Sequence, residues 1–213
     1  MLKNLMPSLN MLIDKDYMFF KTEETEVLIS SILSQLTPVS KPVIMQVSGI
    51  PGAGKSTYCK THILDNFLYL SFDNVMLSLK GYQRELENKG SVYAFSKYEM
   101  EARVIGYELL NRAISKRLNI MFEHSGTNDA HIELFKNIST LGYKTVVNFI
   151  VCDKALAIKR VEQRTSKTKR YVPESHIEER YSKLNFYIKE YQKIASEVNI
   201  LDGANNFASL KKI

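Results

Sequence analysis

The stretch GIPGAGKS, residues 49–56, decides the fold of this chain. It fits the pattern G-x-x-x-x-G-K-[ST] of a phosphate-binding loop. The apolar run before it, at 43–47, is typical of a buried strand, and residues 56–65 after it are typical of a helix. A chance glycine-rich turn between a strand and a helix rarely carries Lys-Ser at this offset. The stretch therefore predicts a binding site for a nucleoside triphosphate.

Each residue type in this loop has a chemical reason. Glycines let successive backbone N–H groups turn toward phosphate oxygens, and the following helix adds the positive end of its dipole. In such loops the lysine, here Lys55, reaches the β- and γ-phosphates, and the hydroxyl of Ser56 ligates Mg²⁺. The loop therefore predicts ATP and Mg²⁺ as cofactors. The predicted nucleotide-binding residues are Gly49, Pro51, Gly52, Ala53, Gly54, Lys55, Ser56 and Thr57.

Length and composition narrow the class of protein. A chain of 213 residues can bury the core of one sizeable domain, whereas two full domains would be cramped. Its apolar runs are too short to span a membrane, and its two cysteines, Cys59 and Cys152, have neither a disulfide nor a metal-ligand spacing. The net charge of +6 suits an anionic ligand. We expect a cytoplasmic protein, although export by a dedicated secretion system would leave no trace in this sequence.

From residue 43 onward, strand and helix patterns alternate along the chain. This alternation predicts an α/β fold with a five-stranded parallel sheet covered by helices on both faces. The strands are expected at 43–48, 68–72, 119–123, 145–151 and 198–201, and the helices at 56–65, 98–117, 129–140, 154–165 and 175–196.

Two segments interrupt the alternation. Residues 76–97 carry two glycines and several charges, which makes them too polar for a core. Residues 165–173 are basic and polar and end in a proline. We expect both at the surface near the phosphate site, where such segments hold the acceptor or close as a lid.

Two carboxylates follow predicted strands. Asp73 comes after an apolar strand, so it should face the crevice beyond the carboxyl ends of the strands, where ligands bind in parallel sheets. It is either a base for an acceptor hydroxyl or the cap of a helix starting at Asn74. Glu123 ends the third strand and is expected to hold Mg²⁺, directly or through water, or to contact the acceptor. The next residue is His124, and a lone histidine near a loop is more often structural.

Three arginines gather near the second polar segment. Arg160 and Arg164 are four residues apart and share one helix face, and Arg170 follows in the presumed lid. Planar guanidinium groups match phosphate oxygens and stabilise charge on a transferring phosphoryl group. The alternative is a solvated helix face paired with Glu162 or Glu178. The neighbouring phosphate loop favours the functional interpretation.

These residues together resemble P-loop kinases of the zeta-toxin type, which are related to the kinase domain of phage polynucleotide kinase. The resemblance runs from about 40 to 203 and includes the phosphate loop. Asp73 stands where these kinases place their catalytic base. The segment FEHSGT, 122–127, is similar to the glutamate-glycine-threonine segment that contacts the substrate in zeta toxins. The resemblance thus implies that Asp73, Glu123 and Thr127 bind the acceptor.

The arginines also fit this resemblance. Arg160, Arg164 and the stretch RYVP at 170–173 are similar to the arginine-bearing lid of both relatives. Two positions depart from the relatives. Asn128 stands where an arginine often follows the glycine-threonine pair of zeta toxins, and Met76 stands where the phage kinase has a substrate-contacting arginine. Both departures concern the acceptor and leave ATP binding untouched.

The resemblance implies a P-loop kinase domain over 41–213, preceded by an N-terminal helical extension over 1–40. Within the kinase domain, the lid would lie at about 165–173 and the acceptor-binding insertion at about 76–97. Such an enzyme would transfer the γ-phosphate of ATP to a hydroxyl of a small molecule. Zeta toxins phosphorylate a sugar hydroxyl of UDP-N-acetylglucosamine, so the resemblance implies that acceptor here. The catalytic residues implied are Lys55, Asp73, Arg160, Arg164 and Arg170.

Other functions stay open at this point. A polynucleotide 5′-hydroxyl kinase of the same fold would bind oligonucleotides, but no aromatic and basic platform for stacking bases is evident, so nucleic acid is the less favoured partner. An ATP-binding switch, or a toxin that acts through a protein partner, is the other alternative. An antitoxin protein is a further partner to consider, on which the residues of this chain carry no information.

Overall fold

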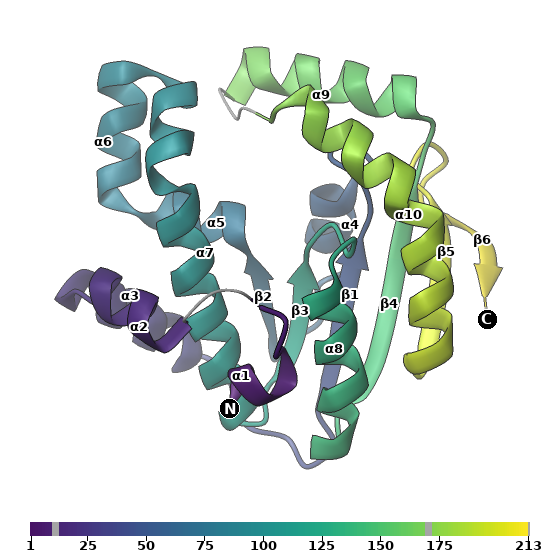
Figure 1. Cartoon of the computed structure of the whole chain (residues 1–213), viewed down its shortest axis with the longest axis horizontal. Helices are drawn as coiled ribbons and strands as arrows, with labels where there is room; N and C mark the ends of the chain where they lie inside the picture. The colour runs from purple at the N-terminus through teal and green to yellow at the C-terminus, as the bar shows by residue number, and fades with distance from the viewer. Residues whose placement is uncertain (10–12, 169–171, 213) are drawn as a thin grey trace.

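The computed structural model of the chain describes residues 1–9, 13–168 and 172–212 (Figure 1). One sheet forms its centre, with the strand order β2-β3-β1-β4-β5-β6. Its strands are β1 (Val43–Ser48), β2 (Phe67–Ser71), β3 (Asn119–Glu123), β4 (Lys144–Val151), β5 (Glu197–Asp202) and β6 (Ala208–Lys212). The first five strands are parallel, as predicted, and β6 pairs antiparallel with β5. The sixth strand was missed because it is a mostly polar edge strand without an apolar run.

Helices cover both faces of this sheet. In Figure 1, α8 and α10 pack over the face toward the viewer, and α4 lies behind it. The helices are α1 (Leu2–Leu5), α2 (Ile13–Phe20), α3 (Glu23–Leu33), α4 (Lys55–His62), α5 (Phe72–Ser78), α6 (Lys80–Lys89), α7 (Ser91–Ser115), α8 (Asp129–Ile138), α9 (Lys154–Thr168) and α10 (Glu174–Ile194), with a 3-10 turn η1 (Ser139–Leu141). The α/β fold with helices on both faces is therefore confirmed.

The register of the central strands brings their carboxyl ends to one edge. Strand β1 runs between β3 and β4, and its side chains Ile44 and Val47 are fully buried. Glu123, at the end of β3, lies level with Val47 of β1 and with Ser71 of β2. The residues that follow β1, β2 and β3 therefore meet beyond this edge, although they are far apart in the sequence.

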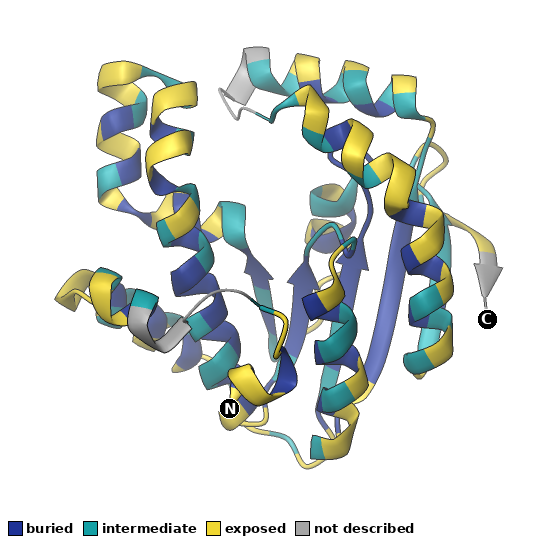
Figure 2. Cartoon of the chain, in the orientation of Figure 1, coloured by how far each residue is buried: buried dark blue, intermediate teal, exposed yellow. Residues whose placement is uncertain are grey.

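The segment 76–97 forms most of a helical hairpin, α6 and the start of α7, that stands away from the sheet (Figures 1 and 2). The expectation that it is too polar for a core is wrong, because Met76, Tyr82 and Ala94 are buried. Apolar residues of the two helices pack on each other, and the buried carboxylate of Glu85 in α6 is paired with Lys97 of α7 at 2.7 Å. A Cβ atom on Gly81 would lie 2.4 Å from the hydroxyl of Tyr98, so this glycine permits the close approach of α6 and α7.

The N-terminal extension packs on α7 through a network of ion pairs. Arg112 of α7 donates to both carboxylate oxygens of Glu26 in α3, at 2.9 and 2.8 Å, and its Nε donates to Glu108 at 2.7 Å. The hydroxyl of Tyr17 in α2 also donates to Glu26. These contacts attach α2 and α3 to the same helix that carries part of the cleft described below. None of the helices, over the described ranges, combines the length and apolarity needed to cross a membrane.

Candidate active site

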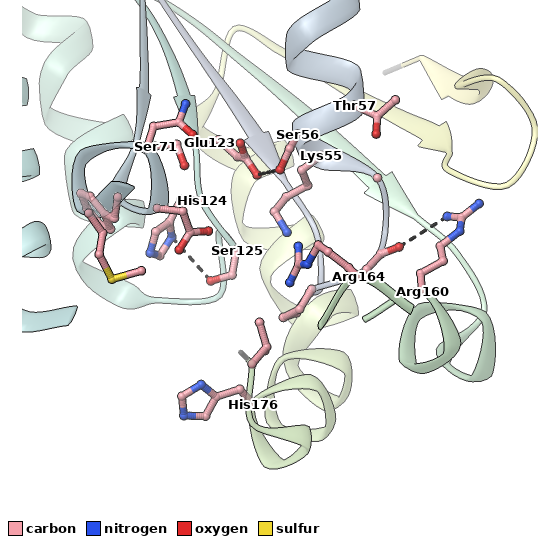
Figure 3. Close-up of a pocket in the computed structure, with 18 of the residues that line it drawn as sticks. Lys55, Ser56, Thr57, Ser71, Glu123, His124, Ser125, Arg160, Arg164 and His176 are labelled. Atoms are coloured by element: carbon pink, nitrogen blue, oxygen red, sulfur yellow. Dashed lines mark hydrogen bonds between the residues drawn. The ribbon is translucent and has the colours of Figure 1, made fainter. Parts of the chain in front are cut away.

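A cleft of about 800 Å³ opens beyond the carboxyl ends of the parallel strands (Figure 3). Its floor is the loop between β1 and α4 and the end of β3. One wall comes from α5, α6 and α7, and the opposite wall from α9, α10 and the turn between β5 and β6. Both polar segments predicted near the phosphate site contribute to these walls: Tyr82 and Phe95 from the first, and Val172 with Pro173 from the second.

The loop between β1 and α4 has the backbone geometry of an anion cradle. Gly52 has a φ of +84°, and a Cβ atom there would lie only 2.2 Å from the carbonyl oxygen of Ala157, so no other residue fits. Gly54 precedes α4 with a φ of +109°, and α4 begins without a side-chain cap. The first backbone N–H groups of α4 are therefore available to an anion at the positive end of the helix dipole.

The predicted nucleotide-binding residues divide into two groups in the structure. Most of them line the cleft, whereas two are buried behind the lining, where they support the loop. The lining residues are Pro51, Gly52, Gly54, Lys55, Ser56 and Thr57, and the supporting residues are Gly49 and Ala53. The ammonium of Lys55 donates to the carbonyl oxygens of Gly49 and Ile50, at 2.9 Å each. These bonds hold the lysine charge over the loop.

Glu123 is buried and held by two hydroxyl groups. The hydroxyl of Ser56 donates to its Oε1 at 2.6 Å (Figure 3), and the hydroxyl of Tyr69 in β2 donates to its Oε2. Burial, followed by the charge of Glu123, raises the pKa of Tyr69, so its hydroxyl keeps its proton and acts as a donor. A serine hydroxyl beside a carboxylate oxygen is a donor set that suits a hard cation such as Mg²⁺. The structure brings together the two residues that the sequence predicts as magnesium ligands, and their binding of Mg²⁺ stays a prediction.

Asp73 lines the cleft from the first turn of α5. That helix starts at Phe72 and its N-cap is Ser71, which makes no capping bond with its side chain. Asp73 is therefore not the cap of a helix starting at Asn74, which was one of its two interpretations. Its role as a base stays a prediction that this position favours.

The predicted arginines differ in their surroundings. Arg160 donates from Nη1 to the carbonyl oxygen of Gly203 at 3.0 Å and to that of Gly52 at 3.4 Å, so it ties the phosphate loop to the β5–β6 turn. Arg164 lines the cleft, where burial lowers its pKa and the charge of Glu123 raises it. Arg170 lies outside the described residues. Glu178, the alternative partner, instead accepts from Lys154 at 2.8 Å.

Thr127 is displaced from the expected position. Its hydroxyl donates to Ser125 at 3.2 Å, and it is Ser125 together with His124 that reaches the cleft. Thr127 itself is not one of the described residues that line the cleft. Its contact with an acceptor therefore stays a prediction.

Two arginines that sequence analysis did not single out also line the cleft. Arg103 comes from the middle of α7, and its Nε lies 3.8 Å from Oε1 of Glu99. Arg180 comes from α10. Burial, followed by the charge of Arg103, lowers the pKa of Arg180. Arg180 ends a basic cluster of the sequence, which was a usable signal. Arg103 carries no motif, and only the tertiary structure brings it to the site.

Both the sequence and the fold of this chain are similar to those of known proteins. Residues 29–208 match the family model of the zeta toxins. A structure from the PezAT chromosomal toxin–antitoxin system of the human pathogen Streptococcus pneumoniae is similar over 90% of this chain and 82% of that chain, with a TM-score of 0.74 and 15% identity. The AvrRxo1-ORF1:AvrRxo1-ORF2 complex with sulphate ions is similar over 90% of this chain and 66% of that chain, with a TM-score of 0.60 and 11% identity. No curated protein sequence matches significantly.

Proposed function

Because the chain belongs to the zeta toxin family and is a P-loop kinase, we propose that it transfers the γ-phosphate of ATP to a hydroxyl of a nucleotide sugar such as UDP-N-acetylglucosamine. One observation carries this proposal. The cleft continues beyond the phosphate loop into a second half, which Arg103, Arg180 and several aromatic rings line, with Asp73 on the wall formed by α5. A kinase with this shape can hold ATP on the loop and a second anionic molecule beside it.

The phosphate loop would hold ATP through its backbone and Lys55. The positive φ angles of Gly52 and Gly54 turn the chain around the anion, and the N-terminus of α4 points at it. In this proposal the ammonium of Lys55 exchanges the carbonyl oxygens of Gly49 and Ile50 for β- and γ-phosphate oxygens. The lysine is already beside the loop, so this exchange needs only a rotation of its side chain.

Ser56 and Glu123 would hold Mg²⁺ together. Their oxygens lie 2.6 Å apart as a hydrogen-bonded pair, and each could bind the ion or one of its waters once the proton between them is displaced. The hydroxyl of Tyr69 would keep Glu123 in place on its other oxygen. When bound, the ion neutralises charge on the β- and γ-phosphates.

Asp73 would act as the base in the transfer. Its carboxylate accepts the proton of the acceptor hydroxyl, whose oxygen forms a bond to the γ-phosphorus. The bond from that phosphorus to the β,γ-bridging oxygen breaks, and ADP leaves. Arg164 neutralises charge on the transferring group, while Arg160 and Arg170 complete the arginine set from the loop side and from the lid. Positioning and charge stabilisation of this kind account for nearly all of phosphoryl-transfer catalysis.

The second half of the cleft suits a nucleotide sugar. Guanidinium groups bind phosphate oxygens in a bidentate way, so Arg103 and Arg180 match a diphosphate. The half-buried ring of Phe95, on the same wall as Arg103, offers an apolar surface on which a nucleobase can stack. The same lining also suits the terminal nucleotide of a nucleic acid, which makes a polynucleotide 5′-hydroxyl kinase the second candidate.

The two candidates are separated by offering both acceptors to one preparation. We would incubate the full chain with γ-labelled ATP and Mg²⁺, together with either UDP-N-acetylglucosamine or an oligonucleotide with a free 5′-hydroxyl, and identify the labelled product by mass spectrometry. Label on the nucleotide sugar supports the proposal, and label on the oligonucleotide overturns it in favour of the second candidate. Release of inorganic phosphate without a labelled acceptor would indicate an ATP-hydrolysing switch.

An antitoxin partner is part of the same proposal. The structural likeness to a member of a toxin–antitoxin system supports a protein that restrains the kinase. A kinase that consumes a nucleotide sugar in the cytoplasm would need such restraint. Co-expression with a protein encoded beside it, followed by copurification, would test for this partner.

A further inference from the structure

His124 follows Glu123 in the chain and lines the cleft, and the mechanism above gives it no role. Its ring is stacked on Phe122, with centroids 5.6 Å apart, and packs edge-to-face against Phe72, the residue before Asp73, at 5.7 Å. These contacts hold the imidazole in one orientation next to the place where an acceptor hydroxyl would meet Asp73.

The hydrogen bonds of His124 determine its tautomer. The backbone N–H of Gly126 donates to Nδ1 at 3.2 Å, and the hydroxyl of Ser125 lies 3.5 Å from the same nitrogen (Figure 3). A nitrogen that accepts from a backbone amide carries no proton, so in the neutral ring the proton is on Nε2. Within the described part of the chain, Nε2 is neither hydrogen-bonded nor among the buried polar atoms that lack a partner. It is therefore open to the cleft.

Groups from four helices surround this ring: His131 of α8, Arg180 of α10, Arg103 of α7 and Lys55 of α4. His131 approaches within 4.0 Å, centroid to centroid, and is itself buried against the hydroxyl of Tyr107. The ring is thus a fixed hydrogen-bond donor among cations.

We propose that His124 is a substrate-binding residue that donates its Nε2–H to an oxygen of the acceptor, adjacent to the hydroxyl that Asp73 deprotonates. This inference rests on the proposed function. A hydrogen-bond donor in this position selects an acceptor whose neighbouring group has an oxygen lone pair, such as a second hydroxyl or a carbonyl oxygen. An ammonium at the same place is rejected, since it has no lone pair and would add to the existing positive charge.

Two substitutions separate binding of the acceptor from support of the loop. His124→Asn keeps a polar group near Nδ1 to accept from Gly126 but removes the donor in the cleft. His124→Gln keeps a donor near Nε2 but removes the acceptor for Gly126. With UDP-N-acetylglucosamine as the probe, we expect His124→Asn to raise KM for the acceptor roughly 3- to 10-fold, the loss of one uncharged hydrogen bond, while KM for ATP stays unchanged. We expect His124→Gln to keep KM near wild type and to lower the Tm.

A purely structural histidine would give the opposite pattern. KM for the acceptor would then follow the Tm, and His124→Asn would bind the acceptor like wild type; that result overturns the inference. If the wild-type protein labels the oligonucleotide and not the nucleotide sugar, the proposed acceptor fails, and the same two variants are compared on the oligonucleotide. The tautomer has its own test: nitrogen NMR of the histidine-labelled chain, with the signal assigned by His124→Asn. An Nε2–H ring is expected, and an Nδ1–H ring would contradict the inference.

Discussion

The hydroxyl of Ser56 donates a 2.6 Å hydrogen bond to Oε1 of Glu123. This bond joins the phosphate loop, which follows β1, to the end of β3. The two residues are far apart in the sequence, and the parallel register of β1 and β3 brings them together. The link places the two expected metal ligands in direct contact. Four predictions start from this arrangement and from the helices around it.

Glu123→Gln should weaken Mg²⁺ binding while leaving nucleotide binding in EDTA unchanged. The amide still accepts from Ser56 but lacks the negative charge that a hard cation prefers. We expect the Mg²⁺ concentration for half-maximal transfer to rise by roughly 10- to 100-fold. A Mg²⁺ titration of binding of a fluorescent ATP analogue gives a readout besides activity. The matched control is Glu99→Gln, a carboxylate on the α7 wall of the cleft, which should leave the Mg²⁺ dependence as it is. An unchanged titration for Glu123→Gln would remove Glu123 from the metal site.

Asp73→Asn should slow transfer strongly and keep ATP affinity. The amide fills the same space in the first turn of α5 but cannot take a proton from the acceptor hydroxyl. We expect kcat to fall by roughly 100- to 10,000-fold, the usual contribution of a general base. Rapid-quench transfer rates and calorimetric ATP binding would be measured together. Asp65→Asn, an exposed aspartate before β2, serves as the control. Wild-type transfer in Asp73→Asn would refute its role as base.

Arg164→Ala should lower kcat more than it raises KM for ATP. The guanidinium lies in the cleft and would act on the charge of the transferring phosphoryl group, so its loss raises the barrier. We expect a decrease of roughly 100- to 1,000-fold. Lys159→Ala, an exposed residue on the same helix, is the matched control. Steady-state kinetics in both substrates would distinguish the outcomes, and a change confined to KM would show that Arg164 only binds ATP.

Glu26→Gln should destabilise the chain at neutral pH and have no effect near pH 2. The hydrogen bonds from Arg112 and Tyr17 lower the pKa of Glu26 from its usual value to about 2. A carboxylate with a lowered pKa contributes stability above its unfolded pKa and loses it as the pH falls through the folded value. The difference in free energy of unfolding between wild type and variant should therefore shrink between pH 4.5 and 2.

Urea unfolding at several pH values checks this expectation. Glu23→Gln, an exposed carboxylate on the same helix, should show no such trend. A difference for Glu26→Gln that stays constant with pH would show that the ion pair with Arg112 adds nothing to the stability of the N-terminal extension.

Much of the fold could be predicted because local patterns carry it. The loop at 49–56 and the apolar runs of β1, β3 and β4 are continuous in the sequence, and the expected bounds differ from the observed ones by at most a residue or so. The polar strand β6 and the hairpin of α6 and α7 escaped prediction. Their stability comes from pairing with β5 and from contact between two helices, which no local pattern records.

The candidate site divides in the same way. The sequence by itself determined the phosphate loop, since its glycines, Lys55 and Ser56 act through backbone geometry within a few residues. Only the tertiary structure decided that Asp73 is not a helix cap, that Glu123 faces Ser56, and that Arg103 and Arg180 share a cleft with them. The physical reason is distance along the chain. A phosphate-binding loop is formed by consecutive residues. The acceptor pocket, in contrast, is lined by helices and strands that are far apart in the sequence and come together only when the sheet forms.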